Sequence, residues 1–272
     1  MLLRVFFWLG GALSLAWCCF AKSFWLLLPL WALLFAAITC LAIFYLFIIS
    51  LFCYGKKPFE KDNAFLRPLA YHTMDCILEF FRFRVHGEGI EKIPAEPCVL
   101  VCNHLSRFDP MVTFVLMKGR RLGFLSKKEN MRIPIAGPII QKIGFLPLDR
   151  ENPIRAMRTI HQGAKLISAQ DFTMGIYPEG TRSFDGKLLE FKPGAFVMAK
   201  RAACPLVICK ICGTNAYHGR FPFRRTDTTF SVLEVVPAEQ VKSMKPEELS
   251  DYARSVIEKN LNEHKLTNIN NK

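Results

Sequence analysis

The first 54 residues carry only two charged side chains, Arg4 and Lys22. Within them Val5 to Ala21 is a largely apolar run of 17 residues without a charge, and Ser23 to Gly55 contains no charge at all. As one helix the second stretch would be about 50 Å long, more than the roughly 30 Å of a bilayer's hydrocarbon core. We expect it to tilt, to break near Pro29 or to lie partly along the interface. A cleaved signal peptide is a poor fit because the apolar sequence continues too far. The segment therefore predicts a membrane anchor of one or two helices.

A cluster of basic residues follows this apolar segment, namely Lys56, Lys57, Lys61 and Arg67. Positive charge beside a membrane segment favours the cytoplasmic side, so we expect the rest of the chain to face the cytoplasm from an inner or endoplasmic-type membrane. The whole chain has 36 Lys and Arg against 23 acids, a net charge of +13. This surplus fits a phospholipid surface, a phosphorylated substrate or nucleic acid. Because no basic helix or aromatic-basic strand face of the RNA-binding type stands out, we expect no nucleic-acid partner.

The ten cysteines of the chain lie mostly in apolar runs, and only Cys209 and Cys212 form a Cys-x-x-Cys pair. A zinc site of this kind needs a second pair or histidines at fixed spacing, and the sequence offers neither. We therefore expect buried thiols in a reducing compartment and no metal site.

From about residue 82, short runs of β-forming residues alternate with segments typical of helices. This alternation is typical of the α/β class, with a mixed, largely parallel sheet of about seven strands flanked by helices. The expected strands are Phe83–His86, Val99–Asn103, Gly123–Ser126, Phe145–Leu148, Met174–Tyr177, Leu206–Cys212 and Phe230–Val236. The expected helices are Pro110–Met117, Pro134–Ile143, Pro153–Ser168, Pro193–Ala202 and Pro246–His264. The predicted division is an anchor over residues 1–56, a basic connecting segment over 57–81, the α/β domain over 82–266 and a frayed polar tail over 267–272.

One strand is expected to end at His104, and a helix start follows at Asp109 and Pro110. Open α/β sheets hold their ligands at the carboxyl ends of parallel strands. Asp is a favoured N-cap, and Pro suits the first helical position. A carboxylate that folds back toward the imidazole would also fix its tautomer and support a positive charge on it. On this stretch alone, a plain strand-to-helix connection with Asp109 as a cap is an equal alternative.

A second loop follows the strand expected at Met174–Tyr177, and it contains Glu179, Gly180, Thr181 and Arg182. Glycine lets a backbone approach a ligand, threonine adds a hydroxyl, and arginine offers a fork that matches phosphate oxygens. Glu179 would hold the arginine or contact the substrate. The alternative is a solvated turn with an incidental Glu–Arg pair.

Two further basic residues, Lys127 and Arg150, also follow expected strands. Each alone would pass for a solvated surface charge. If these strands are parallel, however, all four loops open at the same edge of the sheet. His104 and Asp109 would then share a cleft with the loop around Arg182, which describes a general base beside a phosphate pocket.

The order and spacing of these residues resemble the glycerolipid acyltransferase family typified by 1-acyl-glycerol-3-phosphate acyltransferase. The family's block Asn-His-x-x-x-x-Asp corresponds to Asn103, His104 and Asp109, and Lys127 matches a family lysine ahead of the second block. The other three blocks correspond to Gly144–Arg150, Tyr177–Arg182 and Pro205–Ile208, so that the resemblance covers roughly residues 80–215. The departures from the family pattern are Pro147, Asp149, Cys204 and Cys209.

The resemblance implies a membrane-bound enzyme of phospholipid biosynthesis. It would move a fatty acyl group from acyl-CoA or acyl-carrier protein to the sn-2 hydroxyl of lysophosphatidic acid, giving phosphatidic acid. His104 would be the general base and Asp109 would orient it. The substrate-binding residues implied are Lys127, Arg150, Glu179, Gly180, Thr181 and Arg182. No cofactor or metal is implied, and the partners are the two substrates and the membrane phospholipids.

Other functions stay open. The acceptor could be another lysophospholipid or glycerol 3-phosphate, or His104 could activate water in a hydrolase. From a different class, a membrane-anchored module could capture phosphorylated ligands without chemistry. The His104–Asp109 pair disfavours this last function, because phosphate capture needs only cations. The sequence leaves the donor, the chain length and the oligomeric state undetermined.

Overall fold

Seven strands form one sheet in the order β1-β7-β6-β2-β5-β3-β4, in a computed structural model that describes residues 2–21, 27–54, 59, 63–183 and 185–270. The strands are β1 Phe83–Glu88, β2 Val99–Cys102, β3 Leu122–Lys127, β4 Leu146–Leu148, β5 Thr173–Ile176, β6 Leu206–Cys212 and β7 Thr226–Val236. Neighbouring strands pair in parallel except β6 and β7, which are antiparallel. The expected α/β class, with a mixed and largely parallel sheet of seven strands, is confirmed.

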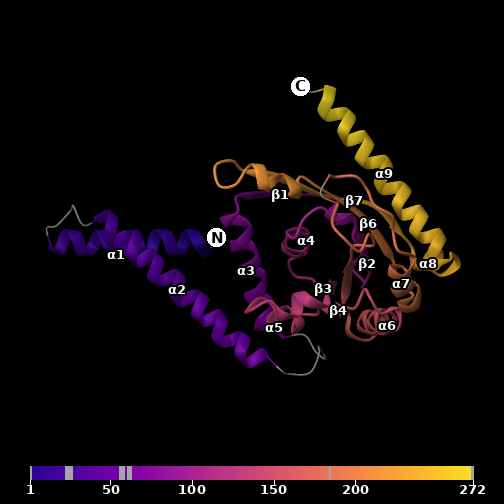
Figure 1. Cartoon of the computed structure of the whole chain (residues 1–272), viewed down its shortest axis with the longest axis horizontal. Coiled ribbons are helices and arrows are strands. Elements are labelled where there is room, and N and C mark those ends of the chain that lie inside the picture. The colour runs from indigo at the N-terminus through magenta and orange to yellow at the C-terminus, as the bar shows by residue number, and fades with distance from the viewer. Residues whose placement is uncertain (1, 22–26, 55–58, 60–62, 184, 271–272) are drawn as a thin grey trace.

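Both faces of the sheet are covered, and β2 shows how the sequence achieves this. Val99 and Val101 point into one apolar core, while Leu100 and Cys102 point into the other. A strand buried on both faces has no polar face, which explains its continuous apolar run. Helices α6, α7 and α9 pack on the first core, and α3, α4 and α5 pack on the second (Figure 1). The edge strand β4 contains Pro147, which an edge tolerates because no partner there needs its missing N–H.

All five helices expected in the α/β domain are present, with shifted ends. Their bounds are α4 Asp109–Leu116, α5 Ala136–Gln141, α6 Pro153–Gln170, α7 Val197–Ala202 and α9 Pro246–Asn270. At the start of α6 the Asn152 carboxamide oxygen accepts from the Arg155 backbone N–H at 3.0 Å, so Asn152 caps this helix. Helix α9 continues to Asn270, which makes the expected frayed tail helical through that residue. The short helix α8 Ala238–Ser243 was not expected.

The segment expected to be a basic connection contains a helix, α3 Leu66–Phe80. Its buried residues Leu66, Ala70, Met74 and Leu78 recur every fourth position and face the second core. Arg67, which we expected to mark the membrane surface, is half-buried and donates to the carbonyls of Leu122 at 2.9 Å and Ile143 at 2.8 Å. The expected positions of Lys56, Lys57 and Lys61 lie outside the described residues.

Two apolar helices precede this body, α1 Leu2–Ala21 and α2 Leu27–Cys53. They pack against each other, and Trp31 Nε1 donates to the Phe7 carbonyl at 3.1 Å. Pro29 lies in the first turn of α2, where proline is tolerated, so the break expected near it does not occur. Among the described residues α2 alone is long and apolar enough to cross a membrane, with a mean hydropathy of 2.7 over its most apolar window.

Candidate active site

Five neighbouring parallel strands end at one edge of the sheet, and each is followed by polar residues. His104 follows β2, Lys127 ends β3 and Arg150 follows β4. The loop with Gly180 follows β5, and Thr214 follows β6. The expectation that four of these loops share one edge is confirmed. Thr214 had not been expected there.

The His104 imidazole is held by a buried carboxylate. Nδ1 of His104 lies 2.7 Å from Oδ2 of Asp109, a residue with no solvent exposure. The same oxygen accepts from the backbone N–H groups of Leu105 at 2.6 Å and Ser106 at 2.8 Å. The other oxygen accepts from the Thr214 hydroxyl at 2.5 Å. A carboxylate with this many donors holds the proton of the neutral imidazole on Nδ1, which leaves the lone pair of Nε2 for a substrate.

Asp109 does not cap its helix, so the expected capping role is wrong. Helix α4 begins at Asp109 itself, and its N-cap residue is Phe108, without a side-chain cap bond. The reason is geometric, because both carboxylate oxygens already accept bonds from the imidazole, the preceding loop and Thr214. The Asp109 carboxylate therefore supports the His104 imidazole and does not cap α4.

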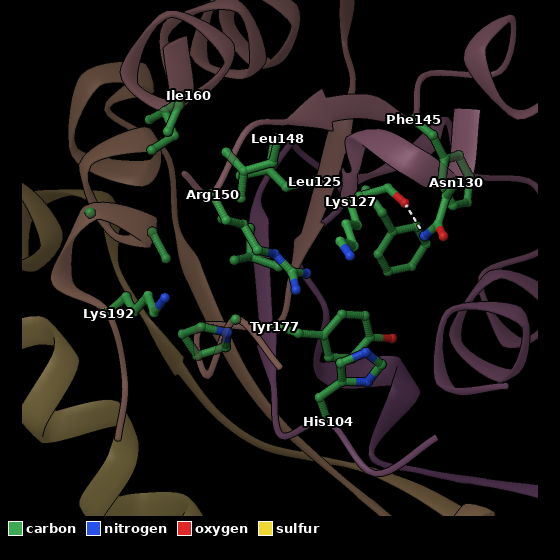
Figure 2. A pocket seen from close by; sticks show the side chains of 18 of the residues that line it. His104, Leu125, Lys127, Asn130, Phe145, Leu148, Arg150, Ile160, Tyr177 and Lys192 are labelled. Atoms are coloured by element: carbon green, nitrogen blue, oxygen red, sulfur yellow. Dashed lines mark hydrogen bonds between the residues drawn. The ribbon is translucent and has the colours of Figure 1, made fainter. Parts of the chain in front are cut away.

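Tyr177 fixes the plane of the imidazole ring. Its ring stacks on His104 with centroids 4.3 Å apart and an angle of 21° (Figure 2). The ring of Phe124 also stacks on Tyr177, at 5.9 Å between centroids and an angle of 5°. Burial raises the pKa of the Tyr177 phenol well above its ordinary value, so the ring stays neutral. The sequence places Tyr177 at the end of a strand and at the start of a family block but does not predict this stacking, which depends on the pairing of β2 with β5.

Glu179 holds the backbone of His104. Its side chain is 3% exposed, with Oε1 accepting from the His104 N–H at 2.7 Å and Oε2 from the Leu189 N–H at 3.1 Å. The Ser183 N–H in turn donates to the His104 carbonyl at 2.8 Å. The loop after β5 is thus fastened to the loop after β2 on both sides of the histidine. Burial raises the pKa of the Glu179 carboxyl, against the lowering effect of its two backbone bonds.

A cavity of about 280 Å³ opens beside His104 and has walls of two kinds. Its polar wall includes Lys127, Arg150 and Lys192, which Figure 2 shows around the same space as His104. The rest is mostly apolar, and the apolar residues that line it include Phe124, Leu125, Phe145, Leu148, Ile160 and Ile176. A cavity with cations at one side and hydrocarbon at the other suits a ligand that is both anionic and apolar.

Three residues of the loop after β5, Gly180, Thr181 and Arg182, differ in their relation to this cavity. Gly180 lines it at φ +69°, a conformation that favours glycine, and a Cβ there would lie 3.2 Å from Nζ of Lys192. Neither Thr181, which is exposed, nor Arg182, which is half-buried, belongs to the lining of the cavity. Desolvation, and then the charge of Arg182, lower the pKa of the Arg150 guanidinium. The positive charge of Arg182 therefore acts on the Arg150 guanidinium.

No sequence pattern predicted that Lys192 lines the cavity, because its position depends on a contact between two separate segments of the chain. Its backbone N–H donates to the Pro178 carbonyl at 2.9 Å, which brings a segment ten residues beyond Arg182 back over Gly180. Lys127 is a cavity residue at the rim, 53% exposed, with Nζ 3.7 Å from Oε2 of Glu129.

The departures from the family pattern in the second block have a structural role. Asp149 lies 3.0 Å from Nζ of Lys128 and 3.6 Å from Nη1 of Arg155, and its pKa is lowered first by the bond to Lys128. The Asp149–Lys128 pair ties the loop after β4 to the loop after β3.

Among the described residues no group of three His, Cys, Asp or Glu side chains is arranged to hold a metal ion. Cys98, Cys102, Cys204 and Cys209 are buried thiols.

Comparison with known proteins shows similarity to a family of acyltransferases. The profile of the Acyltransferase family matches residues 82–211. The 1-acyl-sn-glycerol-3-phosphate acyltransferase of Haemophilus influenzae is 30% identical over 168 residues, which cover 61% of this chain and 68% of that protein. The alpha form from Mus musculus is 26% identical over 72% of this chain and 67% of its own length.

Two further matches concern how much of a relative this chain covers and how similar its fold is to a solved structure. The chloroplast 1-acyl-sn-glycerol-3-phosphate acyltransferase of Brassica napus is 33% identical, but the match spans 49% of this chain and only 38% of that protein. The crystal structure of the 1-acyl-sn-glycerophosphate acyltransferase PlsC from Thermotoga maritima aligns with a TM-score of 0.60 at 25% identity. This alignment covers 73% of the present chain and 79% of PlsC.

Proposed function

Because the chain belongs to the 1-acyl-sn-glycerol-3-phosphate acyltransferase family, we propose that it transfers a fatty acyl group from acyl-CoA or acyl-carrier protein to the sn-2 hydroxyl of 1-acyl-glycerol-3-phosphate. The product would be phosphatidic acid, a precursor of phospholipids. One observation carries the proposal: a fully buried Asp109 lies 2.7 Å from Nδ1 of a histidine that lines a half-cationic, half-apolar cavity.

In the proposed reaction Nε2 of His104 accepts the proton of the sn-2 hydroxyl as the oxygen attacks the thioester carbonyl. The C–S bond then breaks, and the departing thiolate takes the proton from the imidazolium. Asp109 supports the imidazolium while it exists and is not itself protonated. Because the alkoxide attacks the thioester directly, no acyl-enzyme and no metal ion take part.

Cations that line the cavity, together with Arg182 outside its lining, would orient the acceptor. Arg150, Arg182 and Lys127 would bind the phosphate of lysophosphatidic acid, as arginine forks and a lysine suit phosphate oxygens. Lys192, whose ammonium lies against Gly180, would add a fourth cation. The acyl chain of the acceptor would lie along the apolar wall, with its hydroxyl left beside His104. Thr181 and Glu179 would act only by shaping the loop.

The apolar helices would hold this chemistry at a membrane, where the lipid acceptor occurs. With α2 in a membrane and the α/β body on the cytoplasmic side, the cavity would meet lysophosphatidic acid by diffusion in the bilayer plane. The net charge of +13 would favour both anionic headgroups and an anionic acyl donor.

A panel of acceptors and donors tests the proposal. The detergent-solubilised full chain would be given acyl-CoA or acyl-carrier protein together with lysophosphatidic acid, lysophosphatidylglycerol, lysophosphatidylcholine or glycerol 3-phosphate. We expect phosphatidic acid to form fastest, and H104A to form it on the order of 10²- to 10⁴-fold more slowly than the wild type. Folded protein that yields no phosphatidic acid with either donor would overturn the proposal, and faster turnover of another acceptor would replace the substrate.

A further inference from the structure

We propose that the segment Gly219–Arg225, called here the Phe223 loop, binds the surface of a bilayer that contains anionic phospholipids. Its seven residues include three arginines, two phenylalanines and no acid. The loop connects β6 to β7 and contributes no residue to the cavity beside His104. The proposal therefore concerns a second contact of the protein and does not depend on acyl transfer.

The tip of the loop presents apolar surface to the surroundings. The Phe223 side chain is 88% exposed, and Phe80 at the end of α3 is 57% exposed. Arg220, Arg224 and Arg225 around the tip are exposed as well. A phenylalanine surrounded by arginines is suited to the membrane interface, where the ring enters the acyl boundary and the guanidinium groups meet headgroup phosphates.

Ring contacts and hydrogen bonds at its base fix the conformation of the Phe223 loop. The Phe221 ring packs against Phe80 at 5.8 Å and Phe81 at 5.0 Å between centroids. The Arg224 N–H donates to the Arg220 carbonyl at 2.7 Å, and the Arg220 side chain donates to the Arg225 carbonyl at 3.2 Å. Because the base is packed, Phe223 can enter a bilayer with little further ordering of the chain.

The charges around the loop leave a positive surplus. Arg225 lines an open groove together with Arg82 and Arg84, and the acids of that groove are Asp75 and Glu79. Asp227 lies 3.9 Å from both Arg84 and Arg220. The three loop arginines with Arg82 and Arg84 thus face three acids. The surplus is complementary to anionic lipid, and the exposed Phe223 favours a bilayer over a nucleic acid.

The position of the loop links it to the active site. The loop starts five residues after Thr214, whose hydroxyl holds Asp109, and Tyr217 between them packs on Phe108 at 4.8 Å. In Figure 1 the loop projects beyond the end of α3, on the side of the body that carries α1 and α2. Helix α1 packs on α3. A bilayer that holds the apolar helices can therefore also reach the Phe223 loop.

The experiment adds a tryptophan at the tip and measures its depth. The full chain carrying F223W is placed in nanodiscs whose lipids are brominated on the acyl chain, and quenching of the added fluorescence is measured relative to the wild-type chain with its own tryptophans. Discs of phosphatidylcholine alone are compared with discs that also contain phosphatidylglycerol. K242W is the matched control, because Lys242 is exposed on α8, on the opposite side of the body (Figure 1).

A charge series then tests the arginines. The triple variant R220Q/R224Q/R225Q is compared with R201Q/K242Q/K245Q, which removes the same charge from exposed residues on the α7–α9 side. Each basic residue near an anionic surface contributes roughly fivefold to binding, so the loop variant lowers the docking equilibrium on the order of 100-fold.

The proposal predicts quenching of F223W in the anionic discs, its loss in the loop triple variant, and its retention in the control triple variant. K242W stays unquenched in both types of disc. Unquenched F223W in anionic discs would overturn the proposal, as would equal effects of the two triple variants. Because the fluorescence needs no turnover, this result stands apart from the success or failure of the acyl-transfer assay.

Discussion

Two buried carboxylates hold His104, and they hold different parts of it. Asp109 accepts from the imidazole Nδ1, whereas Glu179 accepts from the backbone N–H of the same residue. In the proposed reaction Asp109 would therefore support the charge that develops on the imidazole, whereas Glu179 would fix the position of the loop. Both are acids beside a strand end in the sequence, so their residue type alone does not separate a reacting role from a supporting one. Variants of these two residues and of the groups around them separate the two roles.

Removal of the imidazole removes the proposed base. We expect H104A to lower kcat by roughly 10²- to 10⁴-fold, the usual contribution of a positioned base, while the protein still binds lysophospholipid. H86A is the control, because His86 is exposed on β1, at the edge of the sheet away from the cavity. Equal turnover of H104A and H86A would place the base elsewhere.

Removal of Arg182, which we propose binds the phosphate, should change the affinity for the acceptor more than the rate of transfer. A charge-assisted hydrogen bond contributes about 1.5–3 kcal/mol, so R182A should raise KM for lysophosphatidic acid by roughly 10- to 100-fold with a smaller change in kcat. The exposed Arg201 on α7 supplies the control variant R201A. An equal loss with a neutral acceptor would contradict the phosphate-binding role.

Removal of the supporting carboxylate lowers stability. E179A leaves the N–H groups of His104 and Leu189 without their acceptor and should lower the free energy of unfolding by about 1–3 kcal/mol. Burial raises the pKa of Glu179, so the folded protein keeps this proton to a higher pH than the unfolded chain does. The stability contributed by Glu179 is therefore largest at acidic pH and falls as the pH rises through the folded-state pKa. Thermal unfolding of wild type and E179A across this range would show a difference that shrinks as pH rises, and a growing difference would contradict the assignment.

The smallest effect is expected for Y177F. The stacked ring remains, and the lost contact of the hydroxyl with Thr113 Oγ1 is long, at 3.4 Å. We expect kcat within about twofold of the wild type, since a weak bond contributes well under 1 kcal/mol. Y177A removes the ring and should lose substantially more activity. If the two variants lost equal activity, the hydroxyl rather than the ring would be the important group.

The fold followed from the sequence where local pattern and burial agree. The seven strands were predictable because their apolar runs are short and bounded, and the edge shared by His104, Lys127, Arg150 and Gly180 followed from parallel pairing. Helix α3 was missed although Leu66, Ala70, Met74 and Leu78 have helical spacing, because the basic residues ahead of it suggested a connection.

The rest of the site depends on contacts between distant segments. Thr214 reaches Asp109 across 105 residues, and Lys192 reaches Gly180 only because its backbone bonds to Pro178. The proximity of Glu179 to Arg182 in sequence suggested an ion pair, whereas the strand end turns the carboxylate inward, under His104. No local pattern carries such information, because it arises from the order of the strands in the sheet.

The most direct test compares the two carboxylates in one assay. The rate of acyl transfer at saturating lysophosphatidic acid and acyl donor is measured for D109A and E179A, in samples whose folded fraction is set equal by thermal unfolding. We expect the transfer rate of D109A to fall roughly 10²-fold or more. The rate of E179A should stay within about tenfold of the wild type, because in the proposed mechanism only Asp109 supports the imidazolium. Equal losses in the two folded variants would contradict it.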